Sequence, residues 1–268
     1  MPELPEVETT RRGIRDCLEG KTLDTVVVRE RRLRWPVSVP MSVAGQRLNA
    51  VSRRAKYLLL ELERGTLILH LGMSGRLCLV SENTPPQRHD HVDFVFEDHS
   101  VLRLNDPRRF GSIHWQPMGS VNRLIANLGP EPLSSDFNAD YLITTANKRK
   151  TAIKNLIMDS HVVAGVGNIY ANEALFRSGI RPRRGCGRIT RAEADALVSA
   201  IKETLADALK AGGTTLRDFQ SVDGTRGYFR VSLQVYGREG LPCTKCKTPI
   251  KRVSSDSRQT VYCPKCQR

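Results

Sequence analysis

The pairs Cys243-Thr244-Lys245-Cys246 and Cys263-Pro264-Lys265-Cys266, separated by residues 247–262, decide the fold of the C-terminal part of this chain. Two Cys-x-x-Cys pairs at this spacing are typical of one tetrahedral zinc site, with the intervening residues forming a β-hairpin. Because protein thiolates would fill every ligand position, the sequence predicts one structural Zn²⁺ instead of a catalytic metal. The predicted ligands are Cys243, Cys246, Cys263 and Cys266.

A redox dithiol is the alternative for these cysteines, but no βαβ pattern surrounds either pair. The segment from Gly237 onward is too short for a hydrophobic core, so we expect metal binding to supply its folding free energy. The hairpin is rich in Lys and Arg, and Arg258 is predicted near its tip or in its second strand, where it could contact phosphates. Cys17, Cys78 and Cys186 lack metal-site spacing and are interpreted as packing or loop residues.

Upstream of the hairpin the sequence predicts helices. Thr190 and Glu193 form a capping box, an apolar stripe follows, and Gly212 ends a helix predicted from Thr190 to Lys210. A shorter helix is predicted from Asn168 to Ser178, ending at Gly179. Residues 180–189 join the two helices, which gives a helix–turn–helix-like pair with a long turn.

The N-terminal part, from Pro2 to about Pro117, is instead rich in short strands. It opens with a helix predicted from Pro5 to Leu18, because Pro5 suits a first helical position and apolar residues recur on one face. The predicted strands are Leu23–Arg29, Lys56–Leu62, Thr66–Leu71, Arg76–Val80, Val92–Glu97, Val101–Leu104 and Ser112–Trp115. One helix followed by such strands indicates a β-sandwich or a flattened barrel.

Composition narrows the class of partner. The chain has 268 residues, with 42 Lys and Arg against 28 Asp and Glu, which gives a net charge of +14. Such an excess favours a polyanion, and nucleic acid first, over a merely basic surface. No stretch approaches the roughly 20 apolar residues that span a bilayer, and no signal peptide is recognisable. We therefore expect no membrane partner, a cytoplasmic location and no disulfide framework.

The N-terminus offers a nucleophile. Removal of Met1 would leave Pro2 as a secondary amine, which is partly neutral at physiological pH. Attack of this amine on C1′ of a sugar gives an iminium ion, which acidifies the neighbouring carbon and promotes elimination. Glu3 could protonate the sugar ring oxygen. On their own, Pro2 and Glu3 match many ordinary N-termini.

Six motifs together carry a family resemblance. They are Pro2-Glu3-Leu4-Pro5-Glu6-Val7-Glu8-Thr9, Arg54-Ala55-Lys56-Tyr57, His70-Leu71-Gly72-Met73-Ser74-Gly75, Asp106-Pro107-Arg108-Arg109-Phe110-Gly111, Gly165-Val166-Gly167-Asn168-Ile169-Tyr170-Ala171 and the four cysteines. In this order and over nearly the whole chain, they resemble bacterial formamidopyrimidine-DNA glycosylase. The resemblance implies an α+β multidomain fold: a β-sandwich with an N-terminal helix (2–117), a helix-two-turns-helix domain (118–228) and a zinc-finger β-hairpin (229–268).

The resemblance also implies an activity: a bifunctional glycosylase and AP lyase of base excision repair. It would remove 8-oxoguanine and formamidopyrimidines from damaged double-stranded DNA and then cleave the strand by β,δ-elimination. Pro2 would be the Schiff-base nucleophile and Glu3 the general acid. Lys56 would lie near the lesion phosphates and assist oxidised-purine processing.

Further roles follow from the same resemblance. Met73, Arg108 and Phe110 would fill the void left by the everted base, with Arg108 facing the orphaned cytosine. Phosphate contacts are expected from His70, Lys154, Asn168, Tyr236 and Arg258; Asn168 opens a helix after a Gly-rich turn, which suits an anion. Residues 214–228 resemble a lesion-recognition loop that would contact the everted base. Its candidate residues are Thr214, Thr215, Arg217, Asp218 and Phe219. Arg217 departs from the lysine of some relatives.

Two other functions remain open at this point. An endonuclease VIII-like enzyme of the same fold would remove oxidised pyrimidines. The identities of Leu4 and Val7 in the N-terminal motif, and the set Met73, Arg108 and Phe110, favour the purine enzyme. A non-catalytic zinc-ribbon protein would explain the charge and the cysteines but would leave Pro2 and Glu3 without a role. We expect a monomer that associates with the nucleoid through DNA binding, and activity only in a chain that has lost Met1.

Overall fold

The computed structural model describes residues 2–212, 233–255 and 258–268. The chain divides into two compact units, which are described separately. The first contains the described residues up to Ala126 together with Gly212, and the second contains residues 127–211 and the described residues from 233 onward. Within the described ranges, none of the helices has the length and apolar character that crossing a membrane requires.

The first unit begins with helix α1 (Leu4–Leu18), close to the predicted limits. Glu3 is its N-cap and forms a capping box with Glu6, a pairing that satisfies helix-end amides. Val7, Ile14 and Leu18 are buried on the face that enters the core. The predicted periodicity therefore identified the right face, whereas the capping role of Glu3 was not predicted.

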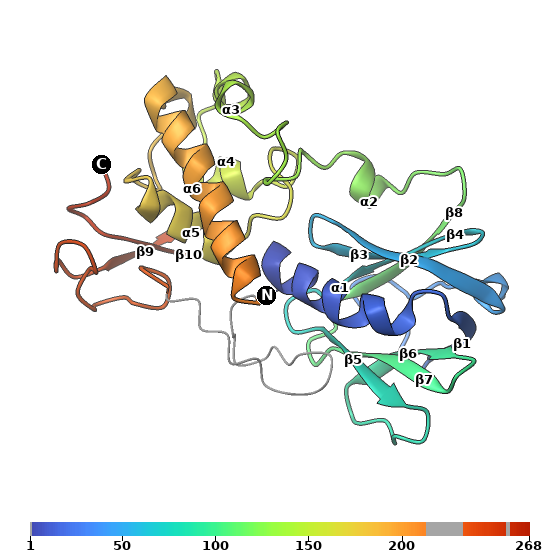
Figure 1. The fold of residues 1–268 in the computed structure, drawn as a ribbon. Coiled ribbons are helices and arrows are strands. Elements are labelled where there is room, and N and C mark those ends of the chain that lie inside the picture. The colour runs from blue at the N-terminus through green and yellow to red at the C-terminus, as the bar shows by residue number, and fades with distance from the viewer. Residues whose placement is uncertain (1, 213–232, 256–257) are drawn as a thin grey trace. The chain divides into compact units, whose positions relative to one another are not determined.

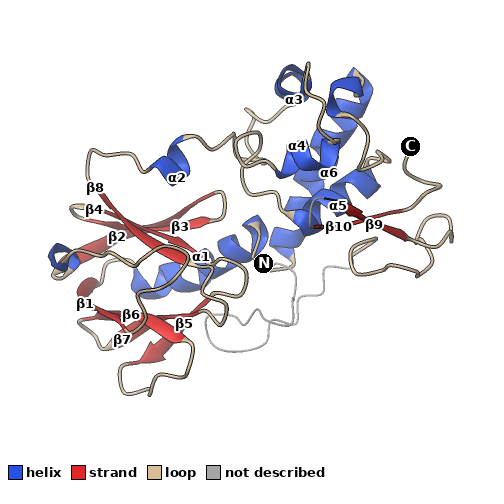
Figure 2. Cartoon of the chain, turned by 180° about the vertical axis from the view of Figure 1, so that it is seen from behind, coloured by secondary structure: helices blue, strands red, loops and turns tan. Residues whose placement is uncertain are grey.

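The strands of this unit are all antiparallel and form one sheet in the order β5-β7-β6-β1-β2-β3-β4-β8. Their bounds are β1 (Thr22–Val28), β2 (Gln46–Arg54), β3 (Tyr57–Leu62), β4 (Gly65–His70), β5 (Arg76–Ser81), β6 (Asp90–Phe96), β7 (Ser100–Asn105) and β8 (Ser112–Pro117). The sheet folds over, so that β2, β3, β4 and β8 form one layer and β1, β5, β6 and β7 the other (Figures 1 and 2). The two layers and α1 enclose one core. The expected β-sandwich with an N-terminal helix is confirmed.

Strand β2 was not predicted from the sequence. Leu48 pairs with Leu62 and Ala50 with Glu61, so the register shifts by one residue between Leu48 and Ala50. This bulge places Leu48 and Val51, three positions apart, both in the core. The apolar residues therefore do not alternate, and the period-two signal of a strand is lost. The unit also has a 3-10 turn η1 (Met41–Val43) and a short helix α2 (Arg123–Ala126).

The second unit is helical. Its elements are α3 (Ala139–Ala146), α4 (Ile153–Met158), α5 (Asn168–Arg177), the 3-10 turn η2 (Cys186–Arg188) and α6 (Arg191–Lys210). The capping box of Thr190 and Glu193 at the start of α6 is present as predicted. α5 ends one residue earlier than predicted, before Gly179.

The hairpin β9 (Lys251–Ser255) and β10 (Arg258–Tyr262) belongs to this same compact unit and lies beside α5 (Figures 1 and 2). We expected no hydrophobic core in this segment, and that expectation is wrong. A small buried cluster forms because α5 contributes Phe176 to it. The hairpin side of the cluster consists of Val235, Cys243, Ile250, Val261 and Cys263.

Candidate functional site

The start of α1 presents the predicted nucleophile and general acid. Pro2 and Glu3 are both buried, and Glu6 is buried behind them. The backbone N–H of Glu3 donates to Oε2 of Glu6 at 2.9 Å, while the Glu3 side chain accepts from the backbone of Glu6. This reciprocal pair fixes the two residues that follow the N-terminus. The nucleophile candidate is therefore attached to the rigid end of a helix.

Lys56 lies in the tight turn between β2 and β3, one residue after Ala55. Ala55 is buried and has a φ of 53°, in the left-handed region that side chains disfavour. Arg53 supports this turn, because its Nη1 donates to the Ala55 carbonyl at 2.8 Å. The sequence predicted Lys56 as the first residue of a strand, whereas the structure places it in the turn that connects β2 and β3.

His70, the last residue of β4, is paired with Tyr57, and their rings lie 4.9 Å apart. Burial, and then the positive charges of Lys56 and Arg34, lower the pKa of His70 to about 4. The imidazole is therefore neutral at physiological pH. Its Nδ1 accepts a 3.0 Å hydrogen bond from the Gly72 N–H, so the ring proton resides on Nε2.

Two loops present the predicted void-filling residues. Met73 is 40% exposed in the loop after β4, and Phe110 is 42% exposed in the loop before β8. The guanidinium carbon of Arg108 lies 5.1 Å from the centroid of the Phe110 ring. Large apolar side chains this exposed are candidates for contact with a partner.

Asp106, which sequence reasoning left without a role, joins these two loops. Its carboxylate is completely buried and accepts from the Ser74 hydroxyl at 2.8 Å and from the Gly111 N–H at 2.7 Å. The Arg108 N–H donates to Oδ1 of Asp106 at 3.3 Å and to Ser74 Oγ at 3.2 Å. The signal available in the sequence was an acid immediately before Pro107, a position typical of a turn.

In the second unit, side chains of α4 and α5 form hydrogen bonds with strand β10. Nζ of Lys154 donates to the Gln259 carbonyl at 2.9 Å and to the Thr260 hydroxyl at 2.7 Å. Nδ2 of Asn168 donates to the same carbonyl at 3.0 Å, and Oδ1 of Asn172 accepts from the Val261 N–H at 3.0 Å. Lys154 is only 3% exposed. Its observed contacts hold the hairpin, and its phosphate contact stays a prediction.

Glu173, also missed from the sequence, anchors the segment that leads into the hairpin. Its carboxylate accepts from the backbone N–H groups of Gln234, Val235 and Tyr236, at distances of 2.8, 3.0 and 2.8 Å respectively. Burial raises the pKa of Glu173, although these three hydrogen bonds oppose the shift. The signal available in the sequence was an acid inside the predicted helix Asn168–Ser178, among mostly apolar residues. Tyr236 is thereby fixed by its main chain, and Arg258 is exposed at the start of β10.

The four predicted metal ligands converge. Their sulfur atoms all lie within 4.8 Å of one another, with 3.9 Å between Cys243 and Cys266 and 3.4 Å between Cys246 and Cys263. Tetrahedral Zn–S bonds of about 2.3 Å require S–S separations of about 3.8 Å, so the cluster fits zinc. Each pair sits on a backbone turn, closed by Lys247 N–H to Cys243 and by Gln267 N–H to Cys263.

Comparison with known proteins accounts for nearly the whole chain. Residues 1–113 match the formamidopyrimidine-DNA glycosylase N-terminal domain, residues 128–220 match the H2TH domain of the same enzyme, and residues 240–268 match a zinc finger found in FPG and IleRS. The geometry and this match together establish the cysteine cluster as a zinc finger that binds one structural Zn²⁺.

Full-length relatives agree with this assignment. The chain is 54% identical over 271 residues to formamidopyrimidine-DNA glycosylase of Thioalkalivibrio sulfidiphilus and 53% identical over 270 residues to that of Marinobacter nauticus, with 100% of each chain covered. The crystal structure of the MutM (FPG) protein from Thermus thermophilus has a TM-score of 0.90 at 39% identity and covers 99% of this chain and 98% of its own. A Lactococcus lactis FPG mutant in complex with DNA containing Fapy-dG has a TM-score of 0.92 at 31% identity, with both chains covered completely. The resemblance first read from six motifs is confirmed, and this chain belongs to the formamidopyrimidine-DNA glycosylase family.

Proposed function

We propose that this protein binds damaged DNA and acts as a bifunctional glycosylase and AP lyase on oxidised purines, with the amine of Pro2 as nucleophile. The observation that carries the proposal is the buried Pro2-Glu3 pair at the rigid start of α1, in a chain that matches these glycosylases over its full length. A Lactococcus lactis FPG mutant has been crystallised with DNA containing Fapy-dG, and Lactococcus lactis Fpg with DNA containing an abasic site; these are the substrate and intermediate that we expect for this chain.

The chemistry begins after Met1 has been removed. The neutral Pro2 amine attacks C1′ of the lesion nucleotide, the bond to the damaged base breaks, and the base departs with a proton. The positive end of the α1 dipole favours a neutral amine over an ammonium at this position. The resulting iminium ion makes the C2′ hydrogen acidic, so loss of that proton expels the 3′ phosphate, and a second elimination expels the 5′ phosphate.

Glu3 protonates the sugar ring oxygen and so opens the ring to the iminium ion. Its capping contacts with Glu6 hold the carboxyl group in place before the substrate arrives. Lys56 lies in the β2–β3 turn near His70, and its ammonium contacts the phosphates that flank the lesion. These are proposed roles, and each can be tested by substitution.

Eversion of the damaged base leaves a gap in the duplex. Met73 and Phe110 fill it, because both are large, apolar and exposed on loops that touch each other. Arg108 stacks beside Phe110 and faces the orphaned cytosine, whose acceptor groups a guanidinium can bind.

His70, Lys154, Asn168, Tyr236 and Arg258 are the proposed phosphate contacts. His70 donates as a neutral N–H group, whereas Arg258 contributes a full positive charge. The zinc ion stabilises the hairpin that carries Arg258 and takes no part in bond breaking. The proposed lesion-recognition residues Thr214, Thr215, Arg217, Asp218 and Phe219 lie outside the described residues.

We also propose that the protein is a monomer, that it is cytoplasmic and associates with the nucleoid through DNA, and that it has three domains at 2–117, 118–228 and 229–268. A monomer suits an enzyme whose proposed catalytic groups all come from one chain. Light scattering of the purified protein, with and without a lesion duplex, would test the oligomeric state.

Borohydride trapping tests the chemistry. The processed chain should form a covalent complex with a duplex containing 8-oxoguanine opposite cytosine, and a chain that retains Met1 should form none. The retained-Met1 protein is the matched control, because its Pro2 nitrogen is a tertiary amide that cannot attack C1′, and its α-amine lies one residue away on Met1. Tight binding without a trapped complex would contradict the proposed enzyme.

The substrate class needs its own comparison. An endonuclease VIII-like enzyme would release thymine glycol faster than 8-oxoguanine under identical single-turnover conditions. We expect the reverse order. A preference for the pyrimidine would replace the proposed substrate while leaving the Pro2 mechanism intact.

A further inference from the structure

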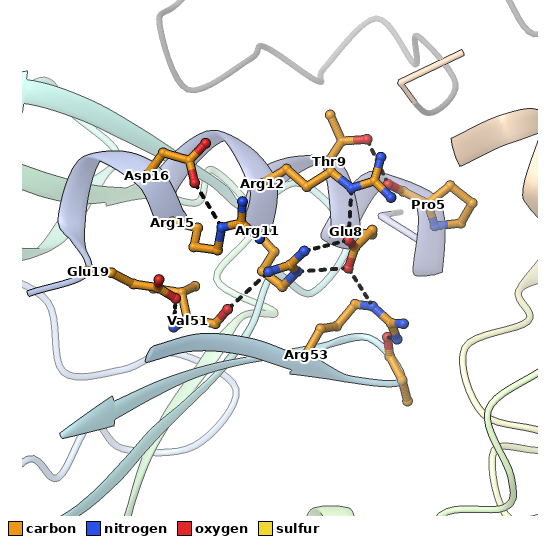
Figure 3. Close-up of polar contacts among 11 residues, drawn as sticks. Pro5, Glu8, Thr9, Arg11, Arg12, Arg15, Asp16, Glu19, Val51 and Arg53 are labelled. Atoms are coloured by element: carbon orange, nitrogen blue, oxygen red, sulfur yellow. Dashed lines mark hydrogen bonds and ion pairs between the residues drawn. The ribbon is translucent and has the colours of Figure 1, made fainter. Parts of the chain in front are cut away.

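Glu8 is a buried carboxylate that the proposed chemistry does not use. It lies on α1, and its two oxygens contact three guanidinium groups (Figure 3). Arg11 and Arg12 come from the next turn of the same helix, at 2.8 and 2.9 Å. Arg53 comes from the end of β2, with its Nε 3.2 Å from Oε2 of Glu8. These contacts hold the pKa of Glu8 at about 2 against the opposing effect of burial, so Glu8 is charged at physiological pH.

The helical contacts of Glu8 are ordinary pairs at i+3 and i+4, and they suffice to stabilise a helix. The contact with Arg53 is different, because it crosses from the helix to the sheet. α1 already has a second attachment to β2: Arg11 donates to the Val51 carbonyl at 3.2 Å, and Glu19 accepts from the Val51 N–H at 2.7 Å (Figure 3). Arg53 is therefore not needed merely to keep the helix on the sheet.

The other arm of Arg53 reaches the turn. Its Nη1 donates to the Ala55 carbonyl at 2.8 Å while its Nε faces Glu8. Ala55 is held in the left-handed region, a conformation that persists only where the surroundings impose it. Lys56 is the next residue. The continuous path thus runs from the helix that begins after Pro2, through Glu8 and Arg53, to the peptide group that precedes Lys56.

We infer that Glu8 is a positioning residue, which, through Arg53, sets the turn that carries Lys56 relative to the helix that carries Pro2. The inference rests on the proposed role of Lys56 in processing the oxidised purine. Glu8 lies about one helical turn after the start of α1, so the same helix end positions Pro2 and the carboxylate that Arg53 contacts. A neutral side chain at position 8 would weaken the contact between α1 and Arg53, and so would loosen the coupling of the helix to the turn.

A double-mutant cycle tests whether Glu8 acts through Lys56. The variants are Glu8→Gln, Lys56→Ala and their combination, and the measurement is single-turnover excision of 8-oxoguanine opposite cytosine at saturating enzyme. We expect Glu8→Gln to slow excision about tenfold or more, as for other losses of catalytic alignment. In the Lys56→Ala background the same change should have no further effect. Effects that multiply would overturn the inference.

A second pair of variants separates positioning from stability. Arg53→Lys keeps a cation near Glu8 but removes the forked guanidinium that also reaches Ala55. It should slow excision as Glu8→Gln does, with an almost unchanged melting temperature. Arg12→Ala is the matched control, because it removes a partner of Glu8 on the exposed side of α1 only. If Arg12→Ala slows excision as much as Arg53→Lys, Glu8 serves the helix and the inference is wrong.

Failure of the proposed function would look different from failure of the inference. A wild-type protein that is not trapped by borohydride would contradict the proposed function itself. A trapped wild-type protein whose Lys56→Ala variant excises at the normal rate would overturn the positioning role alone.

Discussion

The hydroxyl of Ser74 donates a 2.8 Å hydrogen bond to the buried carboxylate of Asp106, and this bond joins the loop that presents Met73 to the loop that presents Phe110. Because the carboxylate also accepts from the Gly111 N–H, both loops are fixed from one point. Such a common support suits the proposed entry of both side chains into a duplex, since independent loops would lose more conformational entropy on binding.

Replacing Ser74 with Ala should therefore weaken both stability and recognition. Loss of the hydrogen bond to the carboxylate costs about 1.5–3 kcal/mol of unfolding free energy, and the Arg108 N–H also loses Ser74 Oγ as one of its two acceptors. We also expect slower base eversion, followed with a fluorescent base beside the lesion. Ser81→Ala is the matched control, because the Ser81 hydroxyl is exposed and only accepts from the Asn83 N–H. Equal eversion rates in the two variants would show that the Asp106 contact has no part in recognition.

Gly72 tests how closely the two loops must approach. Its φ is 61°, and a Cβ there would lie 2.3 Å from the carbonyl carbon of Phe110. Gly119 has a φ of 76° with nothing within 4 Å of its Cβ position. Gly119→Ala should cost only the left-handed strain of about 1–2 kcal/mol. Gly72→Ala should cost clearly more, because Phe110 must move. Chemical denaturation of both variants measures the difference, and similar costs would contradict the steric argument.

His70 should bind DNA without a charge. Its pKa of about 4 lies below the ordinary 6.5, so its contribution to fold stability is complete above pH 6.5 and is lost as the pH falls toward 4. A ring titration by NMR should give this low pKa. His70→Gln should weaken DNA binding but leave the slope of log affinity against log salt unchanged.

Arg258 is the charged comparison for His70. Arg258→Gln should reduce the magnitude of that salt slope by about 0.9, because one phosphate contact is lost. A similar fall in His70→Gln would mean that His70 is protonated in the complex.

Glu173 should be essential to the second unit. In Glu173→Gln one carboxylate oxygen becomes an amide nitrogen, and one of the three backbone N–H groups loses its acceptor. A buried donor without an acceptor costs about 1–3 kcal/mol. Thermal unfolding measures the loss. Glu203→Gln on α6 is the control, since Glu203 pairs with Arg177 at the exposed surface and should change stability little.

Removal of zinc should lower the affinity for DNA but leave the reaction of the Pro2 amine unchanged. A chelator, or Cys246→Ser, should unfold the knuckles and weaken DNA binding, because the hairpin loses the metal that organises its small core. Borohydride trapping at saturating DNA should continue, since the proposed nucleophile lies in the other compact unit. Loss of trapping at saturation would mean that the hairpin takes part in the chemistry.

Sequence reasoning succeeded where the signal is local. The α6 capping box and the four cysteines are short-range patterns, and each specifies its own geometry. It failed at β2, because the bulge after Leu48 destroys the alternation on which strand prediction depends. The fold class nevertheless followed, since the remaining strands and the helix were sufficient.

The site was predictable only in part. The family resemblance proposed residues for contact with DNA, such as Phe110, but it supplied no role for Asp106, Arg53 or Glu173. Their partners are brought together by tertiary contacts, such as the one between Glu173 and Gln234, which are 61 positions apart, and no periodicity encodes such contacts. For Lys154, by contrast, the resemblance implied a phosphate contact, but the structure shows its Nζ donating to Gln259 and Thr260 within the protein.

The attachment of β10 to the helices uses mainly its peptide groups: the Gln259 carbonyl and the Val261 N–H. Every amino acid except proline has both groups, so these hydrogen bonds depend little on which side chains residues 259 and 261 carry. A substitution at Gln259 would therefore leave the hairpin attached, and one at Arg258 would remove the proposed phosphate contact without detaching the hairpin. The same property allows positions 258 and 259 to be randomised in a library, whereas the buried side chains of Thr260 and Val261 must be kept.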